Sequence, residues 1–421
     1  MTHDTPQKPK RDKRITRLIA LCWIVYACSY IGKLSFNANL HPIGLAYGAS
    51  YAEVGMISTF FFFAYGAGQI VNGLLCKHYP IRTVIFVSLL VASAMNLAVV
   101  LAPSFAYLKF FWLVNGVALS FLWTSLIRLL SETLPAHAVP KAVVVMGTTV
   151  ATGTFAIYGM SALFTAIATY RITFYIAAGV LAAVSLLWVV CYKPLVRPLR
   201  EEREAERKNL PPPTPEQERK TSHAIVSLVV VLAFFAVANN FVRDGLTSWM
   251  PDILATLYRT PDWLSILLTL LLPVLSVGGT VIALLLQRLV KEFVATCTIL
   301  FCAASALLGI VLACLSHDVL PVTVGGFAIV SCLMASVNNI ITSMVPLHLK
   351  DSGNSGMLAG VLNGFCYLGS TASAYGLGAI ADGAGWQAVF YTLLGVGCAV
   401  ALIGIVTCTV KRICKQKTPN C

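Results

Sequence analysis

Two basic residues lie within apolar stretches that are long enough to cross a lipid bilayer. Lys33 lies in the stretch 23–40, and Arg243 lies in the stretch 230–249. A charged side chain near the centre of a membrane helix costs about 2.5–3.5 kcal/mol on insertion scales, so such a residue faces a water-filled cavity or a partner. Arginine offers a planar fork of donors to phosphate or carboxylate, and lysine acts as a point charge. The pair therefore predicts a site for an anionic ligand.

Lys33 and Arg243 occupy corresponding places in a weak internal repeat. The stretch 170–175 (YRITFY) resembles the stretch 386–391 (WQAVFY), and these two stretches are separated by almost the same number of residues as the two cations. Transporters built from parallel repeats bind their substrate between the repeats, near the middle of the membrane. The structural alternative is that each side chain extends to the membrane interface.

Several uncharged polar residues lie near the two cations along the sequence. Tyr26 and Tyr30 precede Lys33 by two turns and one turn of a helix, so they share its face. Their hydroxyl groups are able to donate hydrogen bonds to an anion, although packing explains these tyrosines equally well. The further candidates for substrate binding are Asn37, Gln69, Asn239 and Asn240.

Asp244 is the only carboxylate well inside a predicted membrane span. Neighbouring residues of a helix point about 100° apart, so Asp244 need not neutralise Arg243. It either pairs with a neighbouring helix or takes up a coupling proton, and the sequence leaves both roles open.

The sequence contains no pattern typical of an enzyme or a metalloprotein. It has no nucleotide-binding motif, no catalytic triad order and no Cys and His spacing that fits a zinc site. Most of the 13 cysteines lie in apolar stretches, where they behave as small hydrophobic residues. Six histidines, including His41, map to loops or helix ends, and most of them are expected to be solvated. We therefore expect no catalytic residue, no metal and no cofactor.

The composition is that of a membrane protein. Hydrophobic residues make up 58% of the 421 residues and charged residues only 11%, whereas a soluble protein has about 25% charged residues. The formal net charge of +13 comes from basic residues that cluster in the termini and in loops on one side of the predicted spans. This is the positive-inside pattern, so nucleic acid is not an expected partner.

Apolar stretches of about 20 residues, the length that crosses a bilayer, recur along the whole chain. They predict an all-α polytopic membrane protein with twelve transmembrane helices in two pseudo-symmetric six-helix bundles. The predicted helices cover residues 16–42, 52–75, 81–101, 107–134, 141–168, 173–193, 224–250, 263–286, 292–316, 320–347, 356–381 and 386–410.

One long polar segment divides these helices into two halves. Residues 194–222 are rich in charges and contain three consecutive prolines, so they cannot form a core. The basic residues predict that this linker and both termini are cytoplasmic. We expect a monomeric protein of the cell membrane. The predicted segments are a basic tail, an N-terminal bundle, a linker, a C-terminal bundle and a second basic tail, at 1–15, 16–193, 194–222, 223–410 and 411–421.

Short motifs are spread along the predicted helices. The most specific is the stretch 243–251 (RDGLTSWMP), which fits the pattern R-x-G-x-x-x-W-x-P. The other motifs begin at Tyr30 (YIGKLSF), Tyr65 (YG, followed by Gly73 and Arg82), Trp123 (ending at Arg128), Tyr367 (YLG) and Gly385 (GW). Together they resemble the motifs of the organophosphate:phosphate antiporter family of the major facilitator superfamily, which includes exchangers of glycerol-3-phosphate and hexose phosphates.

This resemblance covers nearly all of the predicted helices and implies the major facilitator fold. In the family, two arginines bind the substrate phosphate, and Lys33 and Arg243 stand at their positions. A further basic residue that some members carry falls at Gln69.

The expected function is secondary active transport of a small organic anion. The resemblance favours a phosphorylated sugar or polyol that is exchanged for inorganic phosphate by alternating access. The alternatives are a proton-coupled organic anion symporter that uses Asp244, and a membrane sensor of phosphorylated sugars. The expected partners are the anion, phosphate or a proton, and the lipid bilayer.

Overall fold

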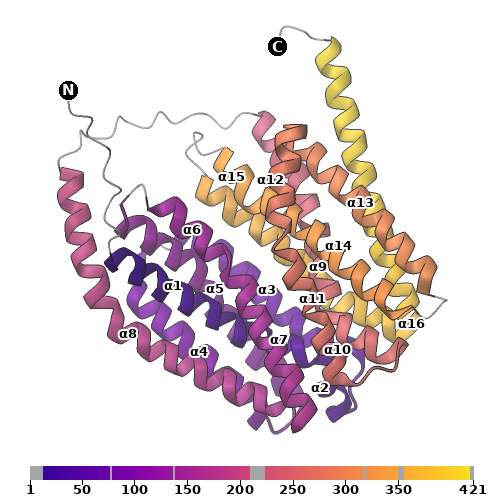
Figure 1. Cartoon of the computed structure of the whole chain (residues 1–421), viewed down its shortest axis with the longest axis horizontal. Helices are drawn as coiled ribbons and strands as arrows, with labels where there is room; N and C mark the ends of the chain where they lie inside the picture. Colours follow the sequence, from indigo (N-terminus) through magenta and orange to yellow (C-terminus); the bar gives the residue numbers. More distant parts are fainter. Residues whose placement is uncertain are drawn as a thin grey trace, which may run out of the picture.

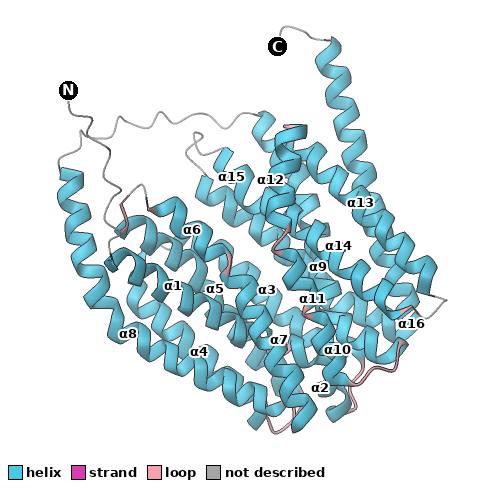
Figure 2. Cartoon of the chain, in the orientation of Figure 1, coloured by secondary structure: helices cyan, strands magenta, loops and turns pink. Residues whose placement is uncertain are grey.

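Long apolar helices make up the part of the chain that our computed structural model describes, which is residues 13–75, 78–135, 138–208, 223–315, 319–348 and 355–417. No strand occurs among these residues (Figure 2). Eleven helical stretches within them are long and apolar enough to cross a membrane. The last stretch, Gly360–Ile413, contains two spans, because Gly385 has a φ of 77° and interrupts the helix. The predicted all-α fold of twelve membrane helices is therefore confirmed.

The first half of the chain forms one bundle, on the left of Figure 1. Its helices are α1 (Lys13–Leu34), the 3₁₀ turn η1 (Asn37–Asn39), α2 (Leu40–Tyr47), α3 (Tyr51–Leu75), α4 (Ile81–Leu101), α5 (Ala106–Thr133), α6 (Val139–Gly147), α7 (Thr149–Ile167) and α8 (Arg171–Lys208).

The second half forms the bundle on the right of Figure 1. Its helices are α9 (His223–Leu257), α10 (Asp262–Thr269), α11 (Leu271–Ser276), α12 (Gly279–Val290), α13 (Phe293–Cys314), α14 (Leu320–Asn339), the π-helical turn η4 (Ile340–Met344), α15 (Val345–His348) and α16 (Ser355–Lys417).

Several spans that the sequence predicts as continuous are interrupted. The predicted helix 16–42 ends at Leu34 and resumes as η1 and α2, the predicted helix 141–168 divides at Thr148, and the predicted helix 263–286 divides into α10, α11 and α12. At a break, backbone N–H and C=O groups lose their partners within the helix and need hydrogen bonds from buried side chains instead. Because those side chains come from other helices, the local apolar pattern does not reveal the break.

Helix α8 extends into the predicted linker 194–222. It continues through Pro194 and Pro198 to Lys208, and its last turns bury Val196 and Leu199. The charges of this segment stabilise the helix through i,i+4 pairs such as Arg197–Glu201, with an N–O distance of 2.9 Å. The rest of the linker, residues 209–222, lies outside the described residues, as do residues 1–12 and 418–421 of the predicted tails.

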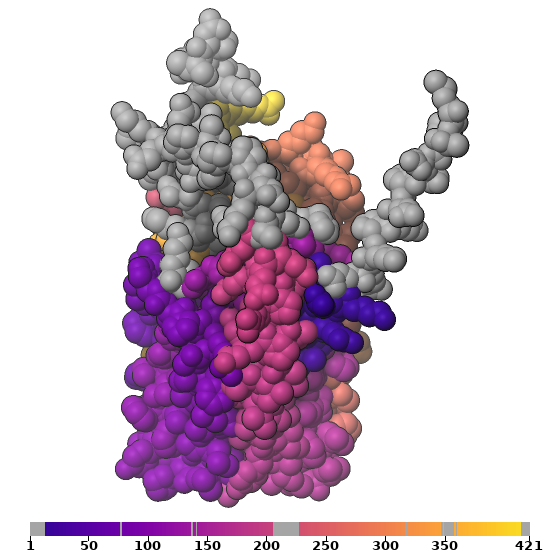
Figure 3. Space-filling model, turned by 90° about the vertical axis from the view of Figure 1, so that its left-hand side faces the viewer, coloured from indigo at the N-terminus to yellow at the C-terminus, as the bar shows by residue number. Residues whose placement is uncertain are grey.

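The helical surface is apolar, and the largely apolar interior also contains buried polar residues. Phe63, Leu101, Val144 and Leu289 are more than half exposed, as expected for side chains that face lipid. Asn96 of α4 and Asn115 and Ser125 of α5 are fully buried instead. Figure 3 shows α8 along the outer face of the first bundle, where it packs against α1 and α4. The fold thus places its polar side chains between helices, among apolar core residues, and presents mainly apolar side chains on the outside.

The two halves meet mainly through α3 against α16 and α7 against α10. At one end of this contact the backbones approach closely at Gly55 and Gly378. A Cβ atom at Gly55 would collide with the carbonyl oxygen of Ala374, and a Cβ atom at Gly378 would lie 2.6 Å from the carbonyl oxygen of Tyr51. The end where α8 and α16 finish lies at the opposite side of the molecule (Figure 1).

Candidate functional site

A break in the first membrane helix positions Lys33. The carbonyl oxygen of Gly32 accepts hydrogen bonds from the amides of Asn96 (3.2 Å) and Asn115 (3.0 Å). The hydroxyl of Ser35 donates to the side chain of Asn96 at 2.6 Å. These side chains of α4 and α5 stabilise the backbone where α1 ends at Leu34, so Lys33 lies at a fixed helix end deep in the protein.

Three tyrosine rings surround the ammonium group of Lys33. The Nζ atom lies 3.9 Å from the ring centroid of Tyr65, 4.9 Å from that of Tyr367 and 5.0 Å from that of Tyr30. Nζ also donates a hydrogen bond of 2.9 Å to the hydroxyl of Tyr367. We call Tyr30, Tyr65 and Tyr367 the tyrosine cage. Since Tyr367 belongs to α16, the cage joins Lys33 to the second half of the chain.

Arg243 of α9 lies beside its neighbour Asp244. The Nε atom of Arg243 is 3.3 Å from the Oδ1 atom of Asp244, and the two side chains are 25% and 16% exposed. The other carboxylate oxygen of Asp244 accepts hydrogen bonds from Ser370 of α16 (2.6 Å) and from Asn240 (3.1 Å). Asp244 therefore forms an ion pair with Arg243 and also accepts a hydrogen bond from a neighbouring helix, α16. The 100° angle between adjacent helix residues does not prevent the ion pair.

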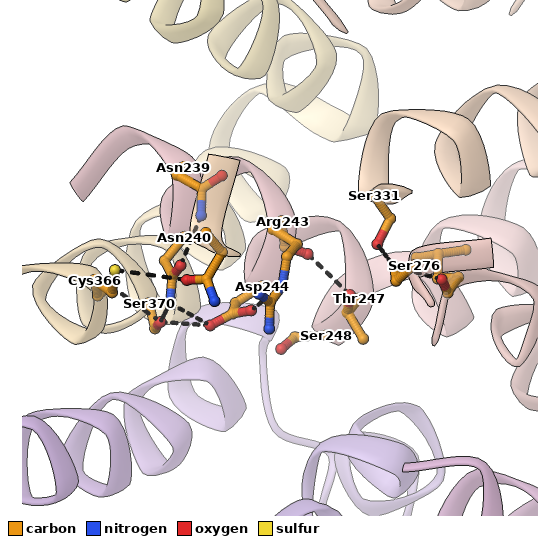
Figure 4. Close-up of polar contacts among 12 residues, drawn as sticks. Asn239, Asn240, Arg243, Asp244, Thr247, Ser248, Ser276, Ser331, Cys366 and Ser370 are labelled. Atoms are coloured by element: carbon orange, nitrogen blue, oxygen red, sulfur yellow. Dashed lines mark hydrogen bonds and ion pairs between the residues drawn. The ribbon is translucent and has the colours of Figure 1, made fainter. Parts of the chain in front are cut away.

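Amide and hydroxyl groups of the second half form one network around Asp244 (Figure 4). The amide of Asn239 donates to Asn240 at 3.0 Å, and the amide of Asn240 donates to the hydroxyl of Ser370 at 3.2 Å. The Oδ1 atom of Asn239 is buried and has no hydrogen-bond partner among the described residues. The network thus contains one buried acceptor whose hydrogen-bonding capacity is unused among the described residues.

The two cations belong to one electrostatic site. Lys33 interacts electrostatically with Arg243 and Asp244, and Arg243 interacts with Tyr30 and Tyr367 of the tyrosine cage. Lys33 comes from the first half and Arg243 from the second. Two cations and one carboxylate leave the site with an excess of positive charge.

The other predicted site residues lie at different distances from this centre. Tyr26 packs against Tyr30 and Trp123, with ring centroids 5.5 Å and 4.8 Å away. Gln69 donates to the backbone carbonyl of Ser120 at 2.9 Å and so lies between α3 and α5. Asn37 donates to the hydroxyl of Ser248 at 2.8 Å, which makes it a contact between the halves.

A group of polar contacts joins the halves at the end opposite the last turns of α8 and α16. His41 of α2 pairs with Asp252 of α9 at 2.9 Å. Asp382 of α16 accepts hydrogen bonds from the backbone N–H groups of Tyr51 (3.0 Å) and Ala52 (2.7 Å), at the start of α3. We call these five residues the gate.

The gate shows that two predictions from the sequence are wrong, one about His41 and one about Asp244. The side chain of His41 is only 14% exposed, so it is paired rather than solvated. Asp252 is 1% exposed and lies within α9, so Asp244 is not the only carboxylate inside a span. The predicted helix ends at residue 250 because proline usually stops a helix, but α9 continues through Pro251 to Leu257.

Tyr65, Tyr367 and Ser370 also belong to the site, although the sequence does not predict them there. Each lies on a helix far from Lys33 or Arg243 in the sequence, and only the packing of α3 and α16 brings it to the site. A signal was present for Tyr65 and Tyr367, because both begin motifs that resemble the antiporter family.

Replacing Asp382 by alanine is expected to open the gate. Both backbone donors at the start of α3 lose their acceptor, which costs about 1–2 kcal/mol and changes the ratio of closed to open protein by about 5-fold to 30-fold. A cysteine introduced at Ser58, which is 1% exposed, should then react faster with a membrane-impermeant maleimide. Glu292→Ala, which removes an exposed carboxylate paired with Lys411, is the control and should leave the reaction unchanged. Equal rates in both variants would contradict this role of Asp382.

Two bundles of membrane helices with charged residues buried between them define the class of this protein, a polytopic membrane protein with the fold of a transporter. The family comparison agrees, since the family model described as "Major Facilitator Superfamily" matches residues 22–374. The chain therefore belongs to the Major Facilitator Superfamily. No curated protein sequence matches the chain.

Three solved structures with the same fold are distant from this chain in sequence. A bacterial homologue of the human lysosomal transporter Spinster, in an inward-facing and occupied conformation, has a TM-score of 0.73 and 12% identity, over 93% of this chain and 96% of that chain. The nucleoside transporter NupG has a TM-score of 0.67 and 12% identity, over 93% and 99%. A POT family transporter in complex with 5-aminolevulinic acid has a TM-score of 0.68 and 12% identity, over 93% and 96%. At this identity the similarity establishes the fold.

Proposed function

We propose that the chain is a secondary transporter that exchanges a small organic anion, preferably a phosphorylated sugar or polyol, for inorganic phosphate. The observation that carries this proposal is the buried Lys33 of the first half, whose Nζ atom donates to Tyr367 of the second half at 2.9 Å, with the guanidinium of Arg243 within electrostatic range. A substrate bound there would contact both halves at once, as alternating access requires.

The charge of the site supports an anionic substrate. Lys33 is 5% exposed, and its nearest partners are uncharged tyrosines. A buried cation without a full counter-charge costs several kcal/mol, and an anion bound between Lys33 and Arg243 would offset that cost. The planar guanidinium of Arg243 suits the oxygen atoms of a phosphate group.

The uncharged groups support a sugar or polyol as the remainder of the substrate. The tyrosine cage offers aromatic faces, and the network of Asn239, Asn240 and Ser370 offers amides and a hydroxyl. The unpaired Oδ1 atom of Asn239 could accept a hydrogen bond from a substrate hydroxyl.

The gate supports alternating access with both termini in the cytoplasm. In this proposal the structure is closed toward the outside, since the gate lies at the end opposite the last turns of α8 and α16. The basic residues at the other end favour the cytoplasm under the positive-inside rule. The rocking of one half against the other would then expose the site to the outside.

Uptake into proteoliposomes tests the exchange. Vesicles loaded with inorganic phosphate should take up labelled sugar phosphates, and this uptake should persist when the proton gradient is collapsed. Vesicles without phosphate should show only the background measured with the Arg243→Gln variant. Exchange would be ruled out by uptake into phosphate-free vesicles that is driven by a pH gradient and lost in Asp244→Asn, since that result identifies a proton symporter. Binding without any uptake would identify a sensor.

A further inference from the structure

A histidine lies between two carboxylates where the halves meet. The Nδ1 atom of His41 is 2.9 Å from the Oδ1 atom of Asp252, and its Nε2 atom is 3.6 Å from the Oδ1 atom of Asp262. His41 belongs to the first half, and both carboxylates belong to the second. Because the two ring nitrogens face different carboxylates, the ring bridges them, and a proton is the ligand that suits this geometry better than a metal ion.

The two carboxylates beside His41 favour the protonated form of its imidazole ring. The side chain of Asp252 is 2% exposed and its Oδ2 atom has no partner among the described residues, while Asp262 is 32% exposed. A neutral imidazole leaves two carboxylates close together, whereas an imidazolium forms an ion pair with each of them.

Other titratable groups on the elements around His41 have partners of their own or lie at the surface. Glu53 of α3 accepts from the backbone N–H of Ser50, and Tyr158 of α7 donates to the carbonyl of Thr247. Asp382 of α16 is the acceptor for the start of α3. The remaining groups are Tyr47 on α2 itself and Tyr258 and Arg259 at the end of α9.

We propose that His41, Asp252 and Asp262 form a proton-binding site that holds the gate closed. Opening separates the ring from both carboxylates, so the closed protein holds the proton more tightly than the open protein. By linkage, acid on the gate side then favours the closed state, and the preference is lost as the pH rises. This inference rests on the alternating-access cycle proposed above and is independent of the substrate.

This site differs from Asp244 in its relation to the moving halves. Asp244 contacts Arg243, Asn240 and Ser370, which all belong to the second half, so opening the gate leaves these contacts in place. His41 and its carboxylates lie on opposite sides of the opening. A change of protonation at His41 is therefore coupled directly to the gate.

The distance across the gate measures this coupling without any substrate. Spin labels introduced through an unnatural amino acid at Tyr47 and Trp263, which are 36% and 40% exposed, report the two sides of the gate in the full-length protein. Between about pH 5 and about pH 8, the range in which histidine titrates, the ratio of closed to open protein should fall at least about tenfold.

Three variants decide the outcome. His41→Gln and Asp252→Asn, which nearly preserve side-chain size, should reduce the pH effect to less than about twofold. His78→Gln, an exposed histidine at the other end of the bundle, should keep it. An unchanged pH effect in His41→Gln, a closed fraction that rises with pH, or a distance that never changes would each overturn the proposal. Because no anion is needed, a failure of phosphate exchange in vesicles would leave this result standing, and the reverse also holds.

Discussion

Replacing Arg243 by glutamine is expected to abolish transport of the anion while the protein remains folded. The substitution removes one of the two cations and leaves Asp244 without its charged neighbour at 3.3 Å. Truncating one partner of a buried charged contact costs about 2–5 kcal/mol, which is a loss of transport of about thirtyfold or more. Initial rates of labelled substrate uptake measure the loss.

Two further variants separate binding from folding in this experiment. Arg243→Gln combined with Asp244→Asn removes the unpaired carboxylate, so it should restore thermal stability but not transport. Arg288→Gln, which changes an exposed arginine of α12, should transport normally. Recovery of transport in the double variant would show that Arg243 acts only as the partner of Asp244.

Replacing Lys33 by glutamine is expected to have an effect of similar size. The variant loses the cation within the tyrosine cage, where a desolvated cation–π contact is worth about 2 kcal/mol, and it loses the hydrogen bond to Tyr367. The expected loss of transport is about thirtyfold. Lys33→Arg keeps the charge but changes its shape, so it should retain part of the activity with weaker apparent substrate affinity.

The readout for Lys33 distinguishes substrate binding from a merely structural role. If Lys33 binds the anion, Lys33→Arg should raise the half-saturating substrate concentration more than it lowers the maximal rate. Lys141→Gln, at an exposed position of α6, is the matched control. Full activity in Lys33→Gln would exclude a role for this cation in the site.

The sequence predicts the helices well where apolar residues decide the structure. The predicted span 81–101 agrees with α4, and the predicted span 107–134 differs from α5 by one residue at each end. The prediction fails where polar contacts determine where a helix ends. At the end of α1, for example, the amides of Asn96 and Asn115 donate hydrogen bonds to the carbonyl oxygen of Gly32. The prediction also fails at Pro251, because a proline pattern does not reveal that packing continues the helix.

The sequence predicts only those site residues whose burial in the membrane carries an obvious free-energy cost. A cation in an apolar stretch is conspicuous, so Lys33 and Arg243 emerge from the sequence. The tyrosine at position 367 and the histidine at position 41 are ordinary residues until α16 and α9 pack beside them. Asp252 stays hidden for a different reason, since the predicted helix ends before it. Contacts between halves depend on the packing of helices distant in sequence, which local patterns do not contain.

The close approach of Gly55 and Gly378 has a consequence for how fast the halves can separate. Where α3 meets α16, backbone lies against backbone, and glycine has no side-chain rotamers to immobilise. Forming the backbone part of this contact therefore costs little conformational entropy, and the side chains that must separate there are the rings of Tyr51, Trp249 and Trp386. In the proposed alternating-access cycle, we therefore expect substitutions at the polar contacts of the gate to change the turnover rate more than substitutions in the apolar core.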